Sequence, residues 1–300
     1  MVTTAGPRGG PVQSVIEPPG TGSPTVLRIL LGAQLRRLRE AKRLSLEDAG
    51  NAIRASHSKI SRLETGRVGF KDRDIVDLLA FYGLTDEKER EALRALAARA
   101  NSPGWWHDYA DVVPNWFDAY VGLEDAASQI RAYELQFVPG LLQTEDYARG
   151  VTMLGYSNPK EINRRVSLRM ARQAVLDRAD APSLWVVLDE ALLRRPIGGT
   201  NAMRAQLKHL IDVAQRPNVT IQMIPFQAGG HAAAGGSFSL LSFAEYGLSD
   251  VVYVEQLTSA QYFDKPDVVA GYSAVMDQLS LDALNPASSV RVLSAMLRDA

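Results

Sequence analysis

Apolar residues recur every three or four positions through the first third of the chain, which is the period of amphipathic helices. The stretch 44–66 predicts two short helices joined by a tight turn. Ser45 and Ser56 stand where these helices would begin, because serine caps helix N-termini. Gly66 stands where the second helix would stop, because glycine accepts the left-handed conformation. The apolar positions of the two helices are Leu46, Ala49, Ile53, Ile60 and Leu63.

Three more helices with the same period are expected around this pair, over residues 26–43, 72–82 and 86–100. Arg36, Arg39 and Arg43 are expected on the outer surface of the first, where they either touch a DNA backbone or solubilise the helix. Five short helices around one core predict an all-α N-terminal domain over residues 26–84, from which the fifth helix leads out.

The segments on either side of this domain have a different composition. Residues 1–25 are rich in Gly, Pro, Thr and Ser without an apolar period, so we expect a disordered tail. Residues 85–122 are expected to form a connecting helix and an aromatic linker. The aromatic cluster either joins the two domains, which we favour, or stacks on bases or a ligand. Its members are Trp105, Trp106, Tyr109, Trp116, Phe117 and Tyr120.

Beyond residue 183 the pattern changes to short β-branched and aromatic runs bounded by turn residues. These runs predict strands at 184–188, 219–226, 237–243 and 251–257, the last two close enough for a hairpin. Helices are expected at 123–137, 160–177, 203–214, 266–284 and 287–298. The fold class is therefore α+β, and the C-terminal domain, residues 123–300, is expected to pack helices on a small mixed or antiparallel sheet.

A formal net charge of −1 hides a strong asymmetry along the chain. Residues 28–70 hold ten Lys and Arg against four acids, whereas residues 101–300 hold 16 basic and 22 acidic residues. A basic segment of this kind is the electrostatic footprint of DNA binding, because phosphate neutralisation supplies most non-specific affinity. We therefore expect double-stranded DNA as a partner.

The polar face of the helix that begins at Ser56 has the residue types of a recognition helix. Hydroxyls and cations at its first turn present donors to phosphates and base edges. Periodicity alone would also allow an ordinary helical hairpin with a solvated face. We expect His57 and Ser58 nearest base edges, and Lys59 and Arg62 at phosphates. The full set of DNA-binding candidates is Ser45, Ser56, His57, Ser58, Lys59, Ser61, Arg62 and Arg67.

Residues 44–66, above all the pattern SxSKISRLETG that begins at Ser56, resemble the Cro/repressor-type helix-turn-helix of bacterial regulators, the XRE family. Two positions depart from that pattern. Gly50 follows Ala49 where the family usually has a small residue after Leu, and Arg54 occupies a turn position that usually holds Gly. A helical glycine costs about 1 kcal/mol relative to alanine, and Arg54 adds strain if its φ is positive. We therefore expect marginal stability with an unchanged fold.

Several later segments resemble a second family. These are 104–106, 138–148, 172–173, 188–190, 195–198, Phe238 and 252–255. They are similar to the DUF5753 domain that follows a repressor-type helix-turn-helix in many actinobacterial regulators, described as Scr1-family antitoxin-like. This resemblance implies a small DUF397-type protein as partner and supplies no catalytic residues.

No constellation for catalysis or metal binding is apparent in the sequence. The four histidines, His57, His107, His209 and His231, stand far apart, there is no Gly-x-Ser-x-Gly motif, and there are no cysteines. The loop 229–237 lacks the lysine of a phosphate-binding loop, and Asp189 and Glu190 are assigned surface or capping roles. We predict no catalytic residue, no metal and no cofactor.

The arginines along residues 160–177 leave two interpretations open, a second phosphate-binding face or a salt-bridged helix, of which the second is favoured. No apolar run approaches the roughly 18 residues that span a bilayer, and the N-terminus lacks the order of a signal peptide. We therefore expect a cytoplasmic protein that does not contact a membrane.

These observations predict a sequence-specific DNA-binding transcriptional regulator whose C-terminal domain binds a partner protein or an effector. A homodimer is expected because one such unit reads only a short half-site. The alternative is an antitoxin-like module that sequesters a small DUF397-type partner and binds DNA for autoregulation. A third class, an enzyme with a DNA-binding domain attached, is disfavoured by the missing catalytic residues.

Overall fold

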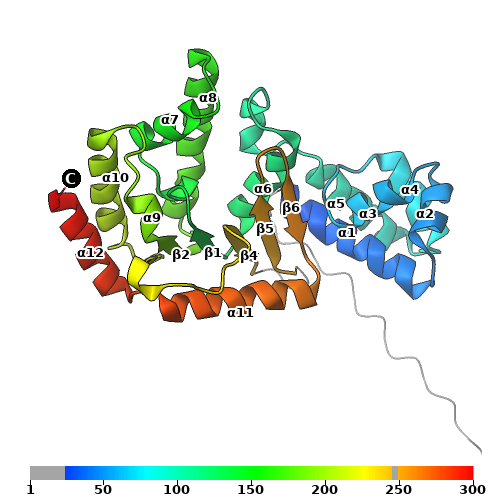
Figure 1. The fold of residues 1–300 in the computed structure, drawn as a ribbon. Helices are drawn as coiled ribbons and strands as arrows, with labels where there is room; N and C mark the ends of the chain where they lie inside the picture. Colours follow the sequence, from blue (N-terminus) through cyan, green and yellow to red (C-terminus); the bar gives the residue numbers. More distant parts are fainter. Residues whose placement is uncertain (1–23, 245–248, 300) are drawn as a thin grey trace, which may run out of the picture.

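The computed structural model describes residues 24–244 and 249–299 (Figure 1). Residues 24–100 form a helical unit, here called the head, which lies beside a larger unit of helices and one sheet, here called the body (Figure 1). This arrangement confirms the predicted α+β class. The expected tail falls on residues 1–23, which lie outside the described residues, and on the first residues of α1.

The head consists of five helices around one hydrophobic core. They are α1 (Pro24–Ala41), α2 (Leu46–Ala52), α3 (His57–Glu64), α4 (Asp72–Phe81) and α5 (Glu87–Ala100). The core includes Leu31 from α1, Leu63 from α3 and Leu79 from α4. Leu93 and Leu96 of α5 belong to the same cluster, and α5 packs against α1 and α4. The fifth helix, which we expected to lead out of the head, is therefore part of its core.

The body is built on a six-stranded mixed sheet. Its strands are β1 (Gln129–Glu134), β2 (Ser183–Asp189), β3 (Val219–Ile224), β4 (Phe238–Ser242), β5 (Val251–Glu255) and β6 (Ala260–Phe263). They lie in the order β3-β2-β1-β4-β5-β6, with β1, β2 and β3 parallel and the other pairs antiparallel. Ile130 of β1 lies opposite Leu184 of β2 on one side and Leu241 of β4 on the other. This confirms the predicted sheet and the β4–β5 hairpin.

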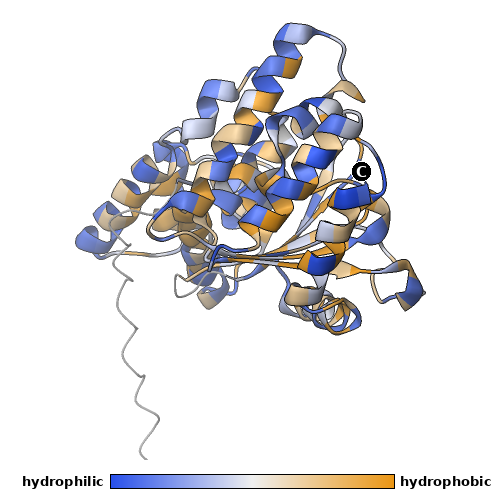
Figure 2. Ribbon diagram, turned by 90° about the vertical axis from the view of Figure 1, so that its left-hand side faces the viewer, coloured by the Kyte–Doolittle hydropathy of each residue, from blue (hydrophilic) through white to orange (hydrophobic). Residues whose placement is uncertain are grey.

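Helices cover both faces of this sheet (Figure 1). α11 (Pro266–Asp282) lies along one face, where Met276 and Leu279 meet Val187 and Val252. The opposite face carries the larger core, which α12 enters through Leu293. The helices on that side are α6 (Asn115–Ala126), α7 (Glu145–Met153), α8 (Pro159–Arg172), α9 (Glu190–Leu193), α10 (Thr200–Val213) and α12 (Pro286–Asp299). Hydrophobic and hydrophilic residues alternate along the helices, as burial of a single face requires (Figure 2).

The body differs from the sequence expectations in three places. A helix was expected over 123–137, but α6 ends at Ala126 and residues 129–134 form β1, the central strand. Ile130 and Tyr133 lie three residues apart, which imitates a helical period. They face opposite sides of a sheet that is buried on both faces, and each enters a different core. The edge strand β6 was missed because it is short and half-exposed. The helix expected to reach residue 177 ends at Arg172, and a 3-10 turn, Gln173–Asp177, follows it.

None of the described helices combines the length and the apolar character that crossing a membrane requires.

Candidate nucleic-acid interface

The two helices of the 44–66 stretch begin where the serines predicted. The Ser45 side chain accepts a hydrogen bond from the Asp48 backbone N–H, while the Asp48 carboxylate accepts one from the Ser45 N–H, which makes a capping box. The Ser56 hydroxyl accepts from the Lys59 N–H at 3.3 Å and caps α3. Gly66 follows Thr65, the C-cap of α3, and has a φ of 67°, as expected for a helix stop. The helix-turn-helix geometry therefore follows from local capping.

The inner side of α3 is fixed to the rest of the head. Ile60 and Leu63 are each 1% exposed and pack in the head core, as predicted. Glu64 at the end of α3 makes a bidentate ion pair with Arg39 of α1, with Nε–Oε1 at 2.6 Å and Nη2–Oε2 at 2.9 Å. Arg39 also donates to the Leu44 carbonyl at 2.7 Å. Arg39, which we had expected on the outer surface of α1, is thus a buried residue that holds α3 in place.

Two glycines allow backbone segments to approach closely around α3. A Cβ on Gly32 of α1 would lie 2.5 Å from the Leu63 carbonyl oxygen, and one on Gly50 of α2 would lie 2.6 Å from the Ala55 carbonyl oxygen. We had interpreted Gly50 as a weakness of α2. The structure corrects this interpretation, because the close contact leaves no space for a side chain. Arg54, in the same turn, has a φ of 54°, so the expected backbone strain is present.

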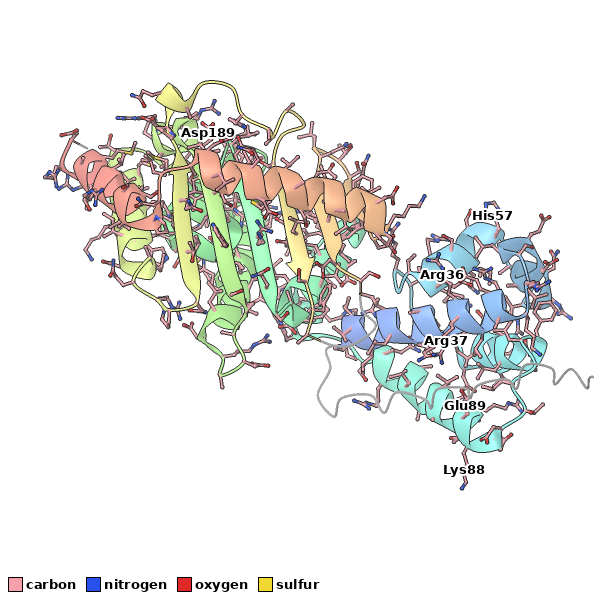
Figure 3. All side chains as sticks on the ribbon, turned by 90° about the horizontal axis from the view of Figure 1, so that it is seen from below. Arg36, Arg37, His57, Lys88, Glu89 and Asp189 are labelled. Atoms are coloured by element: carbon pink, nitrogen blue, oxygen red, sulfur yellow. The ribbon has the colours of Figure 1, made fainter. Side chains whose placement is uncertain are left out.

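The outer side of α3 is polar and accessible. Ser56, His57, Ser58 and Arg62 are exposed. The His57 Nε2 lies 3.3 Å from the Ser58 hydroxyl, and the Arg62 Nε donates to the Ser58 carbonyl at 3.3 Å. Figure 3 shows His57 on the opposite side of the head from Lys88 and Glu89 of α5. Four of the eight candidates thus share one accessible surface.

The other candidates have contacts within the chain. The Lys59 ammonium lies 2.5 Å from the buried carboxylate of Asp74, which joins α3 to α4. Arg67 donates from Nη2 to the Tyr262 carbonyl in β6 at 2.9 Å and lies over the Tyr262 ring, so it connects the head to the body. The Ser45 hydroxyl donates to Asp48 within the capping box, and Ser61 is half-buried.

The head has exposed basic residues beyond the eight candidates, among them Arg43, which we had expected either to touch a DNA backbone or to solubilise the first helix. Those without a carboxylate within ion-pair distance among the described residues include Arg37, Lys42, Arg43 and Arg54. Arg54 lies in the turn directly before α3, and Arg43, with a φ of 58°, lies shortly before α2. The sequence signal for Arg54 was an arginine at a turn position that usually holds glycine. We had interpreted this residue only as a source of backbone strain.

The remaining candidate groups have structural roles. Asp189 accepts a hydrogen bond from the Ala191 N–H at 2.7 Å, which confirms its capping role, and Glu190 accepts one from the Phe226 N–H. Trp106 is 2% exposed and donates to Asp118 at 2.7 Å. The helix that follows, α6, packs against α1, so the aromatic segment lies where the head meets the body.

Comparisons with known proteins agree with this geometry. The family described as helix-turn-helix domain matches residues 30–93, and the family described as domain of unknown function (DUF5753) matches residues 117–295. No curated protein and no solved structure matches the chain. The first match covers all of α2, α3 and α4, which supports a DNA-binding regulator, and the second covers more than half of the 300-residue chain. The chain therefore belongs to the DUF5753 family, as a helix-turn-helix regulator with this domain at its C-terminal side.

Proposed function

We propose that the protein is a sequence-specific transcriptional regulator that acts in the cytoplasm as a homodimer and has no catalytic activity. The accessible polar side of α3, set in a basic head that matches a helix-turn-helix family, carries this proposal. Dimerisation is proposed because one helix-turn-helix reads a short half-site. The body is proposed to bind the partner or effector that controls DNA binding.

Within this function the α3 residues divide into two groups. His57 and Ser58, at the N-terminal turn of α3, are proposed to lie nearest base edges. Ser56 and Arg62 are proposed to contact phosphates, together with Arg54 from the preceding turn. We assign Lys59 to the attachment of α3 to α4 and Arg67 to the contact with the body, because each already has a partner in the chain.

Replacing Arg62 with alanine is expected to weaken binding to all DNA sequences alike. Loss of one phosphate contact should flatten the slope of log affinity against log salt by about one unit. A fluorescence anisotropy titration with labelled duplexes at several salt concentrations measures this slope. Lys88→Ala is the matched control, because it removes the same charge from the opposite side of the head (Figure 3). A slope unchanged in Arg62→Ala, or flattened equally in Lys88→Ala, would contradict the assignment.

Replacing His57 with alanine is expected to change which sequences are bound, because this side chain is placed to read base edges. Selection of sites from a randomised duplex library, by wild type and variant in parallel, measures the preference. The Arg62→Ala protein serves as the control and should select the wild-type site at lower overall affinity. The same selected sequence from the His57→Ala protein would refute base contact by His57.

The alternative role of the body is sequestration of a small DUF397-type protein, with autoregulatory DNA binding. Exposed apolar side chains at the end of α7 favour a protein partner, since Met153 is 61% and Leu154 is 67% exposed. Co-expression with the product of the neighbouring gene tests this role. A stable complex that no longer binds DNA would support it, and separate elution of the two proteins would exclude it.

A further inference from the structure

A large cavity lies in the body at the carboxyl end of the central strand. Its volume is about 670 Å³, within the range of sites for small organic ligands. Glu134 at the end of β1, Phe238 at the start of β4 and Tyr253 in β5 all line it. The end of β1, the start of β4 and the second half of β5 lie at the same end of the sheet, because β4 runs antiparallel to both neighbours. Here β1 has a parallel neighbour, β2, on one side and an antiparallel neighbour, β4, on the other.

One pair of charges in the cavity wall is fully satisfied within the protein. Arg172 donates from Nε and Nη2 to the two carboxylate oxygens of Glu124, both at 2.7 Å. The two residues are 7% and 2% exposed, and the guanidinium lies over the rings of Phe117 and Tyr120. A ligand would find no free charge in this pair.

A second pair of charges lines the same cavity without such partners. Arg169 donates to the Gln143 side chain at 3.0 Å, and neither Arg169 nor Glu134 forms an ion pair among the described residues. Burial raises the pKa of Glu134 to about 8, with a further increase from the nearby Glu255 and an opposing effect of the hydrogen bond with Ser237. Burial, with the neighbouring Arg172, lowers the pKa of Arg169 to about 10, against an opposing effect of the Glu255 carboxylate. Each charged form would therefore be stabilised by an opposite charge placed in the cavity.

The rest of the wall combines apolar and polar side chains. The apolar ones include Phe117, Tyr120, Ile130, Ala132, Leu135, Val138, Leu141, Leu184, Phe238 and Tyr253, and the polar ones are Gln136, Gln143, Ser237, Ser239, Glu255 and Gln256. Arg169 and Glu134 thus offer a guanidinium and a carboxyl outside any ion pair, in a wall with aromatic rings, and Glu255 also lines the cavity. This combination suits a ligand that carries a carboxylate and an ammonium on an apolar body.

We propose that this cavity is the effector site of the protein, and that its ligand is a zwitterion of the size of an apolar dipeptide, with the carboxylate at Arg169 and the ammonium at Glu134. This inference rests on the proposed function, because it names the ligand class that the body binds. It places the site in the body at residues that the DNA interface does not use.

A chain of packed side chains connects this cavity to the head. The ring of Tyr253 lies 4.1 Å from that of Tyr120 and 5.2 Å from that of Tyr262, measured between centroids. Tyr262 donates from its hydroxyl to the Trp116 carbonyl, and its own carbonyl accepts from Arg67, the residue after Gly66. A ligand that moves Tyr253 therefore acts on the β6 contact that holds the end of the helix-turn-helix.

Binding is tested on the full-length protein by isothermal titration calorimetry with L-dipeptides that have apolar side chains, starting with Phe-Leu. We expect saturable binding of one dipeptide per chain. N-acetylated and C-amidated forms of the same dipeptide are expected to bind about tenfold more weakly or worse, because each removes one of the two ligand charges that would pair with Glu134 and Arg169. Absence of binding by every dipeptide, or equal binding of the capped forms, would overturn the proposal.

Variants locate the site. Arg169→Gln and Glu134→Gln are each expected to weaken dipeptide binding about tenfold or more. Arg164→Gln is the matched control on the same helix, because Arg164 is paired with Asp111 at the surface and does not line the cavity. Thermal melts of the free proteins verify folding, and Arg169→Lys, which keeps the charge, should retain part of the affinity. Unchanged binding by Arg169→Gln and Glu134→Gln would place the ligand elsewhere and overturn the assignment.

A separate DNA titration distinguishes failure of the cavity proposal from failure of the proposed function. If the protein binds a specific duplex and no dipeptide, the cavity proposal fails and the regulator stands. If it binds dipeptide and no duplex, the regulator fails and the ligand site stands. If both bind, the dipeptide should change the DNA affinity of the wild-type protein and not that of Arg169→Gln. A wild-type DNA affinity that the dipeptide leaves unchanged would show that the cavity is not an effector site.

Discussion

Replacing Glu64 with alanine is expected to lower the free energy of unfolding of the head by about 3–5 kcal/mol, because the change leaves the Arg39 guanidinium buried without its carboxylate. The side chains of Arg39 and Glu64 are only 10% and 5% exposed, so water cannot replace the lost partner. Domains are stable by only about 5–15 kcal/mol in total, so this loss is large. Thermal and urea denaturation followed by circular dichroism measure it.

Two control variants test whether the lost stability comes from the buried, unpaired charge of Arg39 or from the removal of any carboxylate. Glu40→Ala breaks the exposed Arg36–Glu40 pair and the longer contact of Glu40 with Arg39 at 3.5 Å, and is expected to cost about 0–1 kcal/mol. The double variant Arg39→Met with Glu64→Leu removes both charges and should be more stable than Glu64→Ala alone. DNA binding should weaken in Glu64→Ala as α3 loses its attachment to α1. If Glu64→Ala and Glu40→Ala unfold at the same temperature, the buried Arg39–Glu64 pair is not what holds α3.

Replacing Gly50 with alanine is expected to destabilise the head by about 1–3 kcal/mol, as insertion of a methyl group into packed structure does. The new Cβ would lie 2.6 Å from the Ala55 carbonyl oxygen and 3.3 Å from the His57 backbone nitrogen. Helix propensity alone predicts the opposite sign, a gain of about 1 kcal/mol. Urea denaturation of the variant therefore decides between close packing and propensity.

Gly271 of α11 provides the matched control for this substitution. A Cβ at Gly271 would have nothing within 4 Å, so Gly271→Ala should stabilise the protein by about 0.5–1 kcal/mol. The same chemical change is thus expected to have opposite signs in two helices. Stabilisation by both substitutions would show that the α2–α3 turn has room to adjust.

The helix-turn-helix is the part that could be predicted most completely from the sequence. The capping serines, the apolar positions and Gly66 act through hydrogen bonds and sterics within a few residues, so their pattern carries the information. The strand positions β2 to β5 were predicted for a similar reason, since β-branched runs between turn residues are local signals. Strand β1 was not, because its apolar pattern depends on which faces of the sheet are covered.

Local sequence thus determined where α3 begins and ends and which of its residues point outward. Tertiary structure decided which of its cations remain accessible, because Asp74 and Tyr262, which lie far from Lys59 and Arg67 in the chain, already hold these two side chains. It also decided that Gly50 is a requirement of close packing and that Glu134 and Arg169 share one cavity. The physical reason is that ion pairs, close backbone contacts and cavities arise between residues far apart in the chain, where the spacing of residue types carries no information about distance.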